Sequence, residues 1–463
     1  MAWNRRYSLS SYVRSALWVV PIIALLTALA LNRTSEFIVH WVAAHGGYDL
    51  RHGFLDVSME EAHAILDRVF TLNLSCLVFT FGSLLVAIQV AGGQYTPRII
   101  ATTLLRDNVI RWIVGLFVFS LLWTHRTMSE IGHSHLVPQL QLFIATIIGL
   151  GSLIAFIVLI DYSARLLRPV ALVARIAEHG FAVIKSIYPN PESDERIPCR
   201  SASSPNPMPT PQTFVSGDTC VVYHEGKSGV VLAANLKALL REATIAGCVI
   251  EFAVQIGDFL ATDEPLFYVH GNHEAVDHRR LQNLIALGIE RTMEQDPMFA
   301  FRIEADIALK ALSPAINDPT TAVLALDQLH RLLRVVGKHS LANREVKDAA
   351  GNTRVLFRTP DWEDYVHISF REIRRCGAGN LQIERRLRAM IENLIRTLPA
   401  SRHDALRCEL DLLDAQIVDS HRYESDRRLA HIPDTQGLGG TWYRSSTITK
   451  QEPSTSNAVS DTG

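Results

Sequence analysis

The sequence lacks the residue spacings that mark most catalytic and metal-binding centres. Its six cysteines are widely scattered and none forms a Cys-x-x-Cys pair, the spacing that zinc sites and redox motifs use. It also contains no P-loop, no dinucleotide-binding glycine pattern, no nucleophile–base pair and no paired-carboxylate motif. We therefore predict neither a cofactor nor a metal ion, and an enzyme is the least favoured class of function.

The chain also lacks an excess of charge of either sign. It carries 45 lysines and arginines against 47 aspartates and glutamates. Domains that bind nucleic acid generally show a strong basic excess. The balance of charge therefore predicts no nucleic-acid partner.

Long uncharged runs are missing from the last two thirds of the chain but are frequent before Asp161. A helix needs about 20 apolar residues to cross a membrane, and four segments meet this requirement. They lie at about 15–32, 69–91, 108–125 and 137–160. The predicted fold class is an α-helical membrane protein with four transmembrane helices in residues 1–160. A cytoplasmic α+β region follows, made of a small β-rich module and a helical bundle.

The distribution of basic residues predicts how these spans are oriented, because cytoplasmic loops carry an excess of Lys and Arg. With the N-terminus inside, the cytoplasmic flanks hold ten basic residues, counted as far as Lys185, and the outer loops hold four. The outer loop between Arg33 and Arg68 is also rich in acidic residues. We expect both termini in the cytoplasm and the lipid bilayer as a partner of the spans.

After the fourth span the composition changes several times. Residues 161–188 place basic and apolar side chains at helical spacing. This pattern fits a helix on the inner leaflet or a continuation of the fourth span into a bundle. Residues 189–213 hold seven of the 19 prolines and predict an exposed linker. Residues 214–273 contain short β-rich runs, residues 274–425 contain the apolar stripes of a helical bundle, and residues 426–463 have the polar composition of a disordered tail.

Twice in the predicted bundle an aspartate precedes a proline that opens a helix, at Asp296-Pro297 and at Asp318-Pro319. Aspartate is a favoured N-cap residue and proline is favoured at the first helical position. The structural interpretation is a tight corner between two helices. The functional interpretation is that an exposed helix N-terminus attracts an anion. Four residues would then contact a ligand or another subunit: Arg302, Asn317, Asp318 and Thr320.

Four polar residues lie within the predicted spans or directly after one of them: Asn73, Gln89, Gln94 and Arg111. A polar side chain at membrane depth generally faces protein or water rather than lipid. These residues are therefore candidates either for the lining of a conduit or for hydrogen bonds between helices.

Three phrases of the sequence resemble one protein family. They are Ala311-Leu-Ser-Pro-Ala-Ile-Asn-Asp-Pro-Thr-Thr-Ala322, Arg291-Thr-Met-Glu-Gln-Asp296 and Gln94-Tyr-Thr-Pro-Arg98. In these phrases, and in the order of spans, β segment and helices, the chain is similar to the bacterial predicted integral membrane proteins that carry domain of unknown function 2254. The resemblance covers about Ser15 to Tyr423, with Ala300 and Ala315 where many relatives have glycine. It implies a multi-pass protein of the bacterial inner (plasma) membrane and names no activity.

Two hypotheses about function follow from the sequence. In the first, the protein is a channel or transport-related protein gated by its cytoplasmic region. Four spans are too few to enclose a pathway alone, so this hypothesis requires a homo-oligomer. In the alternative, the protein is a membrane-anchored sensor or scaffold, whose cytoplasmic bundle binds an unidentified ligand or protein partner.

Overall fold

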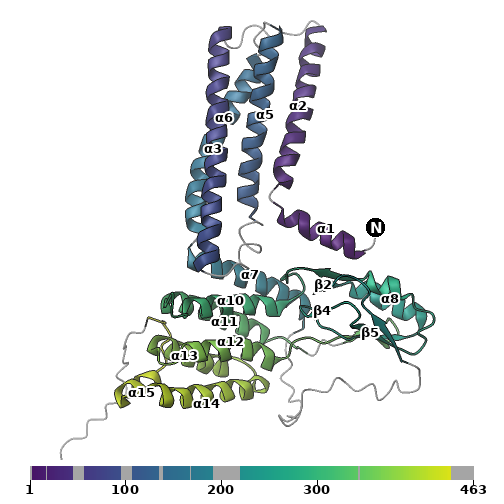
Figure 1. The fold of residues 1–463 in the computed structure, drawn as a ribbon, viewed down its shortest axis with the longest axis vertical. Coiled ribbons are helices and arrows are strands. Elements are labelled where there is room, and N and C mark those ends of the chain that lie inside the picture. The colour runs from purple at the N-terminus through teal and green to yellow at the C-terminus, as the bar shows by residue number, and fades with distance from the viewer. Residues whose placement is uncertain are drawn as a thin grey trace, which may run out of the picture.

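The computed structural model describes residues 3–16, 18–44, 57–94, 107–134, 139–166, 168–190, 219–341 and 345–438. Figure 1 shows long helices side by side at one end of the molecule and an α+β region at the other. Helix α7 (Pro169–Ile187) crosses beneath the long helices, between the two parts. Helix α7 therefore lies at the junction of the two described parts.

The first part contains four long helices: α2 (Val19–Ala44), α3 (Met59–Gln94), α5 (Asn108–Ser134) and α6 (Gln139–Leu166). Three of them hold a stretch that is long and apolar enough to cross a membrane: Met59–Val90, Asn108–Ile131 and Gln139–Arg165. The apolar part of α2 is shorter, at Val19–Thr34. Within the part of the chain that the structure describes, there are thus three candidate spans and one shorter apolar helix.

The first span expected from the sequence, at about 15–32, does not coincide with one helix. The chain forms a separate helix α1 (Trp3–Ser15) and begins α2 only at Val19. Helix α2 then continues past Arg33 to Ala44. The predicted segment therefore starts at the end of α1, because hydropathy alone does not mark the break between two helices.

Two small sheets form the β-rich part. One has the strand order β1-β5-β3-β8-β7 and the other β4-β2-β6. Their bounds are β1 (Thr219–Tyr223), β2 (Gly229–Ala234), β3 (Val249–Phe252), β4 (Phe259–Leu260), β5 (Pro265–His270), β6 (Ile285–Gly288), β7 (Glu345–Lys347) and β8 (Thr353–Leu356). Strand β3 pairs in parallel with β8, and the other pairs are antiparallel. Helices α8 (Leu236–Ala246) and α9 (His278–Gln282) accompany these strands.

The remaining helices form a bundle beneath α7: α10 (Pro297–Ala311), α11 (Pro319–Val336), α12 (Trp362–Cys376), α13 (Leu381–Thr397), α14 (His403–Ser420) and α15 (Glu424–Ala430), with a short 3₁₀ turn at Ala400–Arg402. The apolar stripes of the sequence face its interior. Ala322, Leu326 and Leu329 of α11 are fully buried, and so are Ile383 and Met390 of α13. One hydrophobic cluster runs from this bundle through α7 into the spans.

Three strands lie inside the range that the sequence assigns to the helical bundle. They are β6, β7 and β8. Strands β7 and β8 are three and four residues long, and charged side chains interrupt them. Such short strands carry little alternation, and β8 is held by its pairing with β3, about 100 residues earlier. Most of the predicted linker, from residue 191, and the tail from residue 439 lie outside the described residues.

A candidate ligand pocket and its connection to the spans

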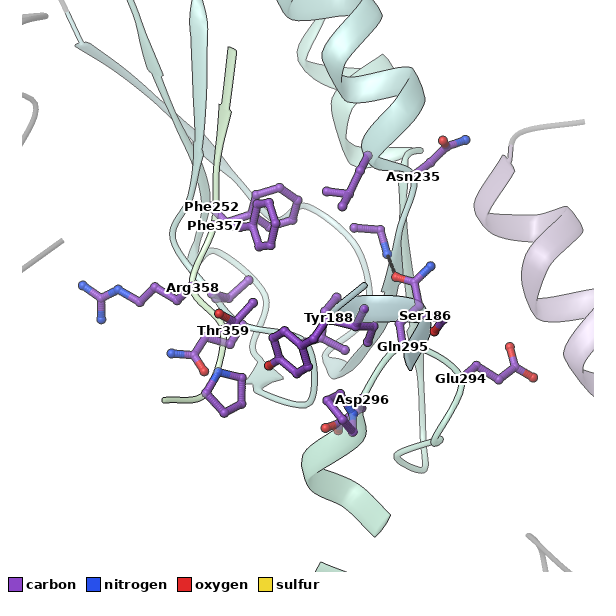
Figure 2. A pocket seen from close by; sticks show the side chains of 18 of the residues that line it. Ser186, Tyr188, Asn235, Phe252, Glu294, Gln295, Asp296, Phe357, Arg358 and Thr359 are labelled. Carbon is purple, nitrogen blue, oxygen red and sulfur yellow. Dashed lines mark hydrogen bonds between the residues drawn. The ribbon is translucent and has the colours of Figure 1, made fainter. Parts of the chain in front are cut away.

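A pocket of about 530 Å³ lies where four parts of the chain meet (Figure 2). Trp3 of α1 lines it, and so does Tyr188, which directly follows α7. The β-rich part contributes residues around Asn235 and Phe252, together with the segment 357–360 after β8. Residues 294–297, at the start of α10, complete the wall. The pocket therefore touches the segment before the spans, the segment after them, and both halves of the α+β region.

The chemistry of the lining is mostly apolar, with amide groups on one side. Phe252 and Phe357 meet edge to face, with ring centroids 6.3 Å apart, and Figure 2 shows both rings beside the cavity. Gln295 brings an amide to the other side, and Asn235 lies at the rim with its side chain directed away from the cavity. Pockets of this kind bind small molecules through apolar contact, and a few polar groups fix the orientation.

The two helices that begin at the pocket are capped by their own side chains. Asn235 accepts a hydrogen bond from the Ala238 N–H at 3.1 Å and caps α8. Asp296 accepts one from the Phe299 N–H at 3.2 Å and caps α10. The capping role predicted for Asp296 is therefore confirmed. Because both caps are filled from within, these N-termini are not open anion sites.

Asp296 is also held by an ion pair. Its carboxylate contacts the Arg291 guanidinium, and the Asp296 side chain is only 3% exposed. Burial raises the pKa of Asp296, an effect that Arg291 opposes. Arg291 thus holds Asp296 in the pocket wall from behind. Gln295 ties the same wall to β2 by accepting a hydrogen bond from the Ala234 N–H at 3.0 Å.

Tyr188 joins the pocket to the centre of the bundle. Its hydroxyl lies 3.1 Å from the hydroxyl of Tyr365 on α12. Burial raises the pKa of Tyr188 to about 12, so the phenol is neutral at physiological pH. Tyr365 packs in turn on Phe301 of α10, with ring centroids 4.8 Å apart. A ligand that displaced Tyr188 would therefore disturb the packing of α7, α10 and α12 together.

The N-terminal helix reaches the same pocket. Trp3 and Tyr7 stack on each other, with ring centroids 5.2 Å apart, and pack on the apolar side chains of β2 and β6. The Tyr7 hydroxyl donates a hydrogen bond to Glu294, and the Asn4 N–H donates one to the Asn283 carbonyl at 3.1 Å. Helix α1 is thus fixed to the α+β region.

Arg111 fixes the other end of α1. Its Nη2 donates to the carbonyl oxygens of Val13 at 3.0 Å and of Ala16 at 2.6 Å. The last carbonyls of a helix have no partner within that helix, and a cation there is favourable. Arg111 is buried and connects α5 to the end of α1. This assigns it a contact between helices, one of the two roles considered for it.

A polar contact that the sequence did not reveal joins the spans to α7. Asp107, before α5, accepts hydrogen bonds from Tyr162 of α6 at 2.5 Å and from Arg175 of α7 at 2.8 Å. Arg175 also donates to the Tyr162 hydroxyl at 3.0 Å, and Asp107 caps α5 through the Val109 N–H at 2.9 Å. One buried carboxylate therefore holds three helices. The only sequence signal was an aspartate directly before an apolar helix.

The four residues proposed for a contact at the bundle corner do not come together. Asp318 caps α11 by accepting a hydrogen bond from the Thr321 N–H at 3.1 Å, while Asn317 adopts a left-handed backbone with φ of 47° in the turn before it. Thr320 is exposed. Arg302 lies elsewhere on α10, paired with Asp306 at 2.5 Å and with Glu372 of α12 at 2.8 Å. The corner has the structural role that the sequence offered first, and a ligand contact there stays a prediction.

The remaining intramembrane candidates differ in exposure. Asn73 is fully buried, and its Nδ2 donates to the Val69 carbonyl at 2.8 Å. Gln89 is exposed on the surface of α3. The side chain of Gln94 lies outside the described residues. Among the residues that the structure describes, no three His, Cys, Asp or Glu side chains are grouped to hold a metal ion.

Comparison with known proteins gives relatives along almost the whole chain. An uncharacterized protein of Mycobacterium bovis and one of Mycobacterium tuberculosis are each 21% identical over 437 residues, which cover 92% of this chain and 81% of the relative. An uncharacterized protein of the Oshkosh strain of Mycobacterium tuberculosis is 20% identical with the same coverage. No solved structure matches the chain. The family described as "Predicted membrane protein (DUF2254)" matches residues 14–393. The chain therefore belongs to this family of predicted membrane proteins.

Proposed function

We propose that this protein is a four-span sensor of the bacterial inner membrane, with both termini in the cytoplasm, which binds a small molecule in the pocket around Tyr188. The observation that carries the proposal is the set of segments in the pocket wall. Trp3 precedes the spans in the chain and Tyr188 follows them, and both line one cavity. A ligand there would act on both connections to the membrane at once.

Two short paths lead from the pocket to the spans. One runs along α1 from Trp3 to the carbonyls of Val13 and Ala16, which Arg111 of α5 holds. The other runs along α7 from Tyr188 back to Arg175, which holds Asp107. Both paths end within the first turn of α5, one at its N-cap and the other at Arg111. A change of pocket occupancy would thus alter the position of α5.

The lining indicates the class of ligand. The rings of Phe252 and Phe357 favour an aromatic or flat apolar body. The amides of Gln255 and Gln295 can donate to an oxygen at its polar end. We expect a small aromatic molecule with an amide or carboxylate group.

A pair of variants of the full chain, purified in detergent, tests this proposal. Ser186→Trp places an indole at the exposed edge of the pocket, and Ala182→Trp places the same group on an exposed part of α7 that does not line the pocket. Small aromatic amides and acids are then screened by saturation-transfer NMR. Members of the set should bind the parent and Ala182→Trp but not Ser186→Trp. If the three proteins bind the same compounds equally, the pocket is not the site.

Amide hydrogen exchange tests the coupling to the spans. Filling the pocket with Ser186→Trp should change the exchange rate at the start of α5, residues 108–112, whereas Ala182→Trp should leave it unchanged. If the exchange rate at the start of α5 is the same in both variants, the pocket is not coupled to the spans and signalling through α5 is refuted.

Labelling in spheroplasts tests the orientation. The exposed native cysteines Cys376 and Cys408 should be shielded from an impermeant thiol reagent, and Asp49→Cys should react. The opposite pattern would reverse the proposed topology.

One observation favours the second candidate, an oligomeric channel. Gln89 is exposed on an apolar stretch of α3, where an amide facing lipid is unfavourable. In a homo-oligomer it would face a neighbouring subunit. Reconstituted parent protein should then conduct ions, and Gln89→Glu should alter the flux without changing oligomer size. If the parent protein is monomeric and conducts no ions, the channel is excluded and the sensor remains the proposed function.

A further inference from the structure

We propose that the interior of the spans contains a water-binding site, formed by Asn73 of α3, Ser120 and Thr124 of α5, and Ser152 of α6. None of these residues belongs to the pocket or to the Asp107 contact. Each is at most 1% exposed. The Oδ1 of Asn73 and the three hydroxyl oxygens have no hydrogen-bond partner among the described residues.

The four side chains lie at the same depth. A Cβ on Gly149 of α6 would meet the Val69 side chain of α3 at 2.7 Å, so these two positions are level. Helices α3 and α6 run in the same direction through the bundle (Figure 1). The rise along a helix is about 1.5 Å per residue. Along the helix axis, towards α7, Asn73 therefore lies about 6 Å beyond Val69, and Ser152 lies about 4.5 Å beyond Gly149. Asn73 and Ser152 are therefore level to within one residue.

Helix α5 contributes at this depth from the opposite direction. The rings of Phe70 and His125 lie 6.4 Å apart. Phe70 and His125 are therefore at about the same depth. Asn73 lies three residues beyond Phe70 along α3, and because α5 is antiparallel, the same depth on α5 lies about three residues before His125, between Ser120 and Thr124. Ser120 and Thr124 are one turn apart and occupy the same face of α5.

That face points to α3 and α6 rather than to α2. Gly115 marks the side of α5 that contacts α2, because a Cβ there would lie 2.9 Å from Cγ1 of Val20. At 3.6 residues per turn, Ser120 and Thr124 lie about 140° and about 180° around the helix from Gly115. The polar groups of α5 therefore face the interior that the three candidate spans share.

The hydrophobic core divides at this layer. An outer cluster includes Leu66 and Trp123, and the large inner cluster includes Cys76 and Phe117. Asn73 lies between Leu66 and Cys76 in the chain, and Ser120 lies between Phe117 and Trp123. Ser152 lies between Ala145 of the outer cluster and Leu159 of the inner one, and Thr124 is next to Trp123 at the outer edge of this layer.

Other hydroxyls in the same helices behave differently. Thr80 donates to the Cys76 carbonyl at 2.7 Å, Thr127 to the Trp123 carbonyl at 2.9 Å, and Thr146 to the Leu142 carbonyl at 2.9 Å. This bond to the carbonyl four residues earlier is the ordinary way to satisfy a hydroxyl in a membrane helix. Ser120, Thr124 and Ser152 direct their hydroxyls elsewhere.

Water suits this set of groups better than an ion. A buried water molecule needs two to four polar partners, and the layer supplies three hydroxyls and an amide oxygen. A cation would lose its hydration without gaining a carboxylate from these four residues, at a large desolvation cost. The structure thus assigns neutral water to the site, where it satisfies groups that would otherwise be buried unpaired.

Radiolytic footprinting tests the assignment, because hydroxyl radicals formed from bound water oxidise adjacent side chains. Cys76 lies three residues from Asn73 on the same face and is 6% exposed. Cys248 is 1% exposed, in the hydrophobic core of the β-rich part, and provides an internal control. In the parent protein in nanodiscs, Cys76 should be oxidised at least five times faster than Cys248. Equal rates would overturn the proposal.

Variants locate the water. Asn73→Leu and the milder Ser152→Ala should each lower the oxidation of Cys76 by several fold. Thr80→Val removes a hydroxyl that is already bonded to the Cys76 carbonyl and should leave the rate unchanged. Size-exclusion profiles identify variants that do not fold, and Ser152→Ala decides the result if Asn73→Leu is among them. If Thr80→Val lowers the oxidation of Cys76 as much as the other variants do, or if no variant lowers it, a water site at this layer is refuted.

Discussion

Replacing Asp107 should destabilise the membrane part of the protein more than any exposed carboxylate does. The Asp107 side chain is 3% exposed, and that of its partner Arg175 is 36% exposed. Asp107→Ala removes the N-cap of α5, a loss of about 1 kcal/mol. It also removes two hydrogen bonds to a charged acceptor, at about 1.5 to 3 kcal/mol each in full burial. The partial exposure of Arg175 reduces its share. We expect a total loss of about 3 kcal/mol.

The measurement is the thermal unfolding of the full chain in detergent, followed for the transition of the spans. A loss of about 3 kcal/mol corresponds to a fall in Tm of about 6 to 12 °C in a unit of 150 to 250 residues. Asp107→Asn can keep the cap while losing the charge, so its effect should be smaller, at about 2 kcal/mol.

Asp161→Ala is the matched control. Asp161 is a carboxylate near the same end of the spans, but its side chain is 62% exposed and it pairs with the exposed Arg165. Such pairs contribute about 0 to 1 kcal/mol. If Asp107→Ala lowers Tm no more than Asp161→Ala does, the three-helix contact does not hold the spans to α7, and one of the two proposed signalling paths fails.

Two further predictions concern the bundle. Asp318→Ala should cost about 1 kcal/mol through the lost cap of α11, while Thr320→Ala, at an exposed neighbouring position, should be neutral in the same melting experiment. Glu304 is fully buried in α10 without a hydrogen-bond partner among the described residues, and burial raises its pKa well above the usual value. Since the folded pKa is the higher one, the parent is most stable below the unfolded pKa and loses stability as pH rises towards the folded pKa. The difference in Tm between Glu304→Gln and the parent should therefore grow in favour of the variant from pH 5 to pH 9. The exposed control Glu372→Gln should show no such trend. If the Tm of Glu304→Gln and that of the parent change with pH in parallel, the Glu304 carboxyl is not neutral in the folded protein.

The parts of the fold that the sequence predicted are those with local signals. Apolar periodicity places Leu326 and Met390 in the bundle core, and the Asp-Pro pairs mark the starts of α10 and α11. These features depend on neighbours within a few residues in the chain. The long apolar helices follow from composition in the same way, and the family confirms their membrane location.

The contacts that define the candidate site could not be predicted because they join distant segments. Asp107 meets residues 55 and 68 positions away, and Tyr188 meets Tyr365 across 177 positions. Nothing near Trp3 indicates that it lines a pocket with residues of β3. Arg111 looked like a charge at the end of a span, whereas its partners are two carbonyls, which have no side-chain signature.

The docking of α1 on the β-rich part also has a consequence for the order of biosynthesis. Tyr7 and Asn4 find their partners 287 and 279 residues later in the chain. At 5 to 20 residues per second, the ribosome needs roughly 15 to 60 s to reach that point. During this interval α1, with its exposed Arg5 and Arg6, has no folded surface to dock on and can rest on the anionic membrane surface. The pocket is therefore among the last features to form, and it closes only after the helices it is proposed to control have been inserted.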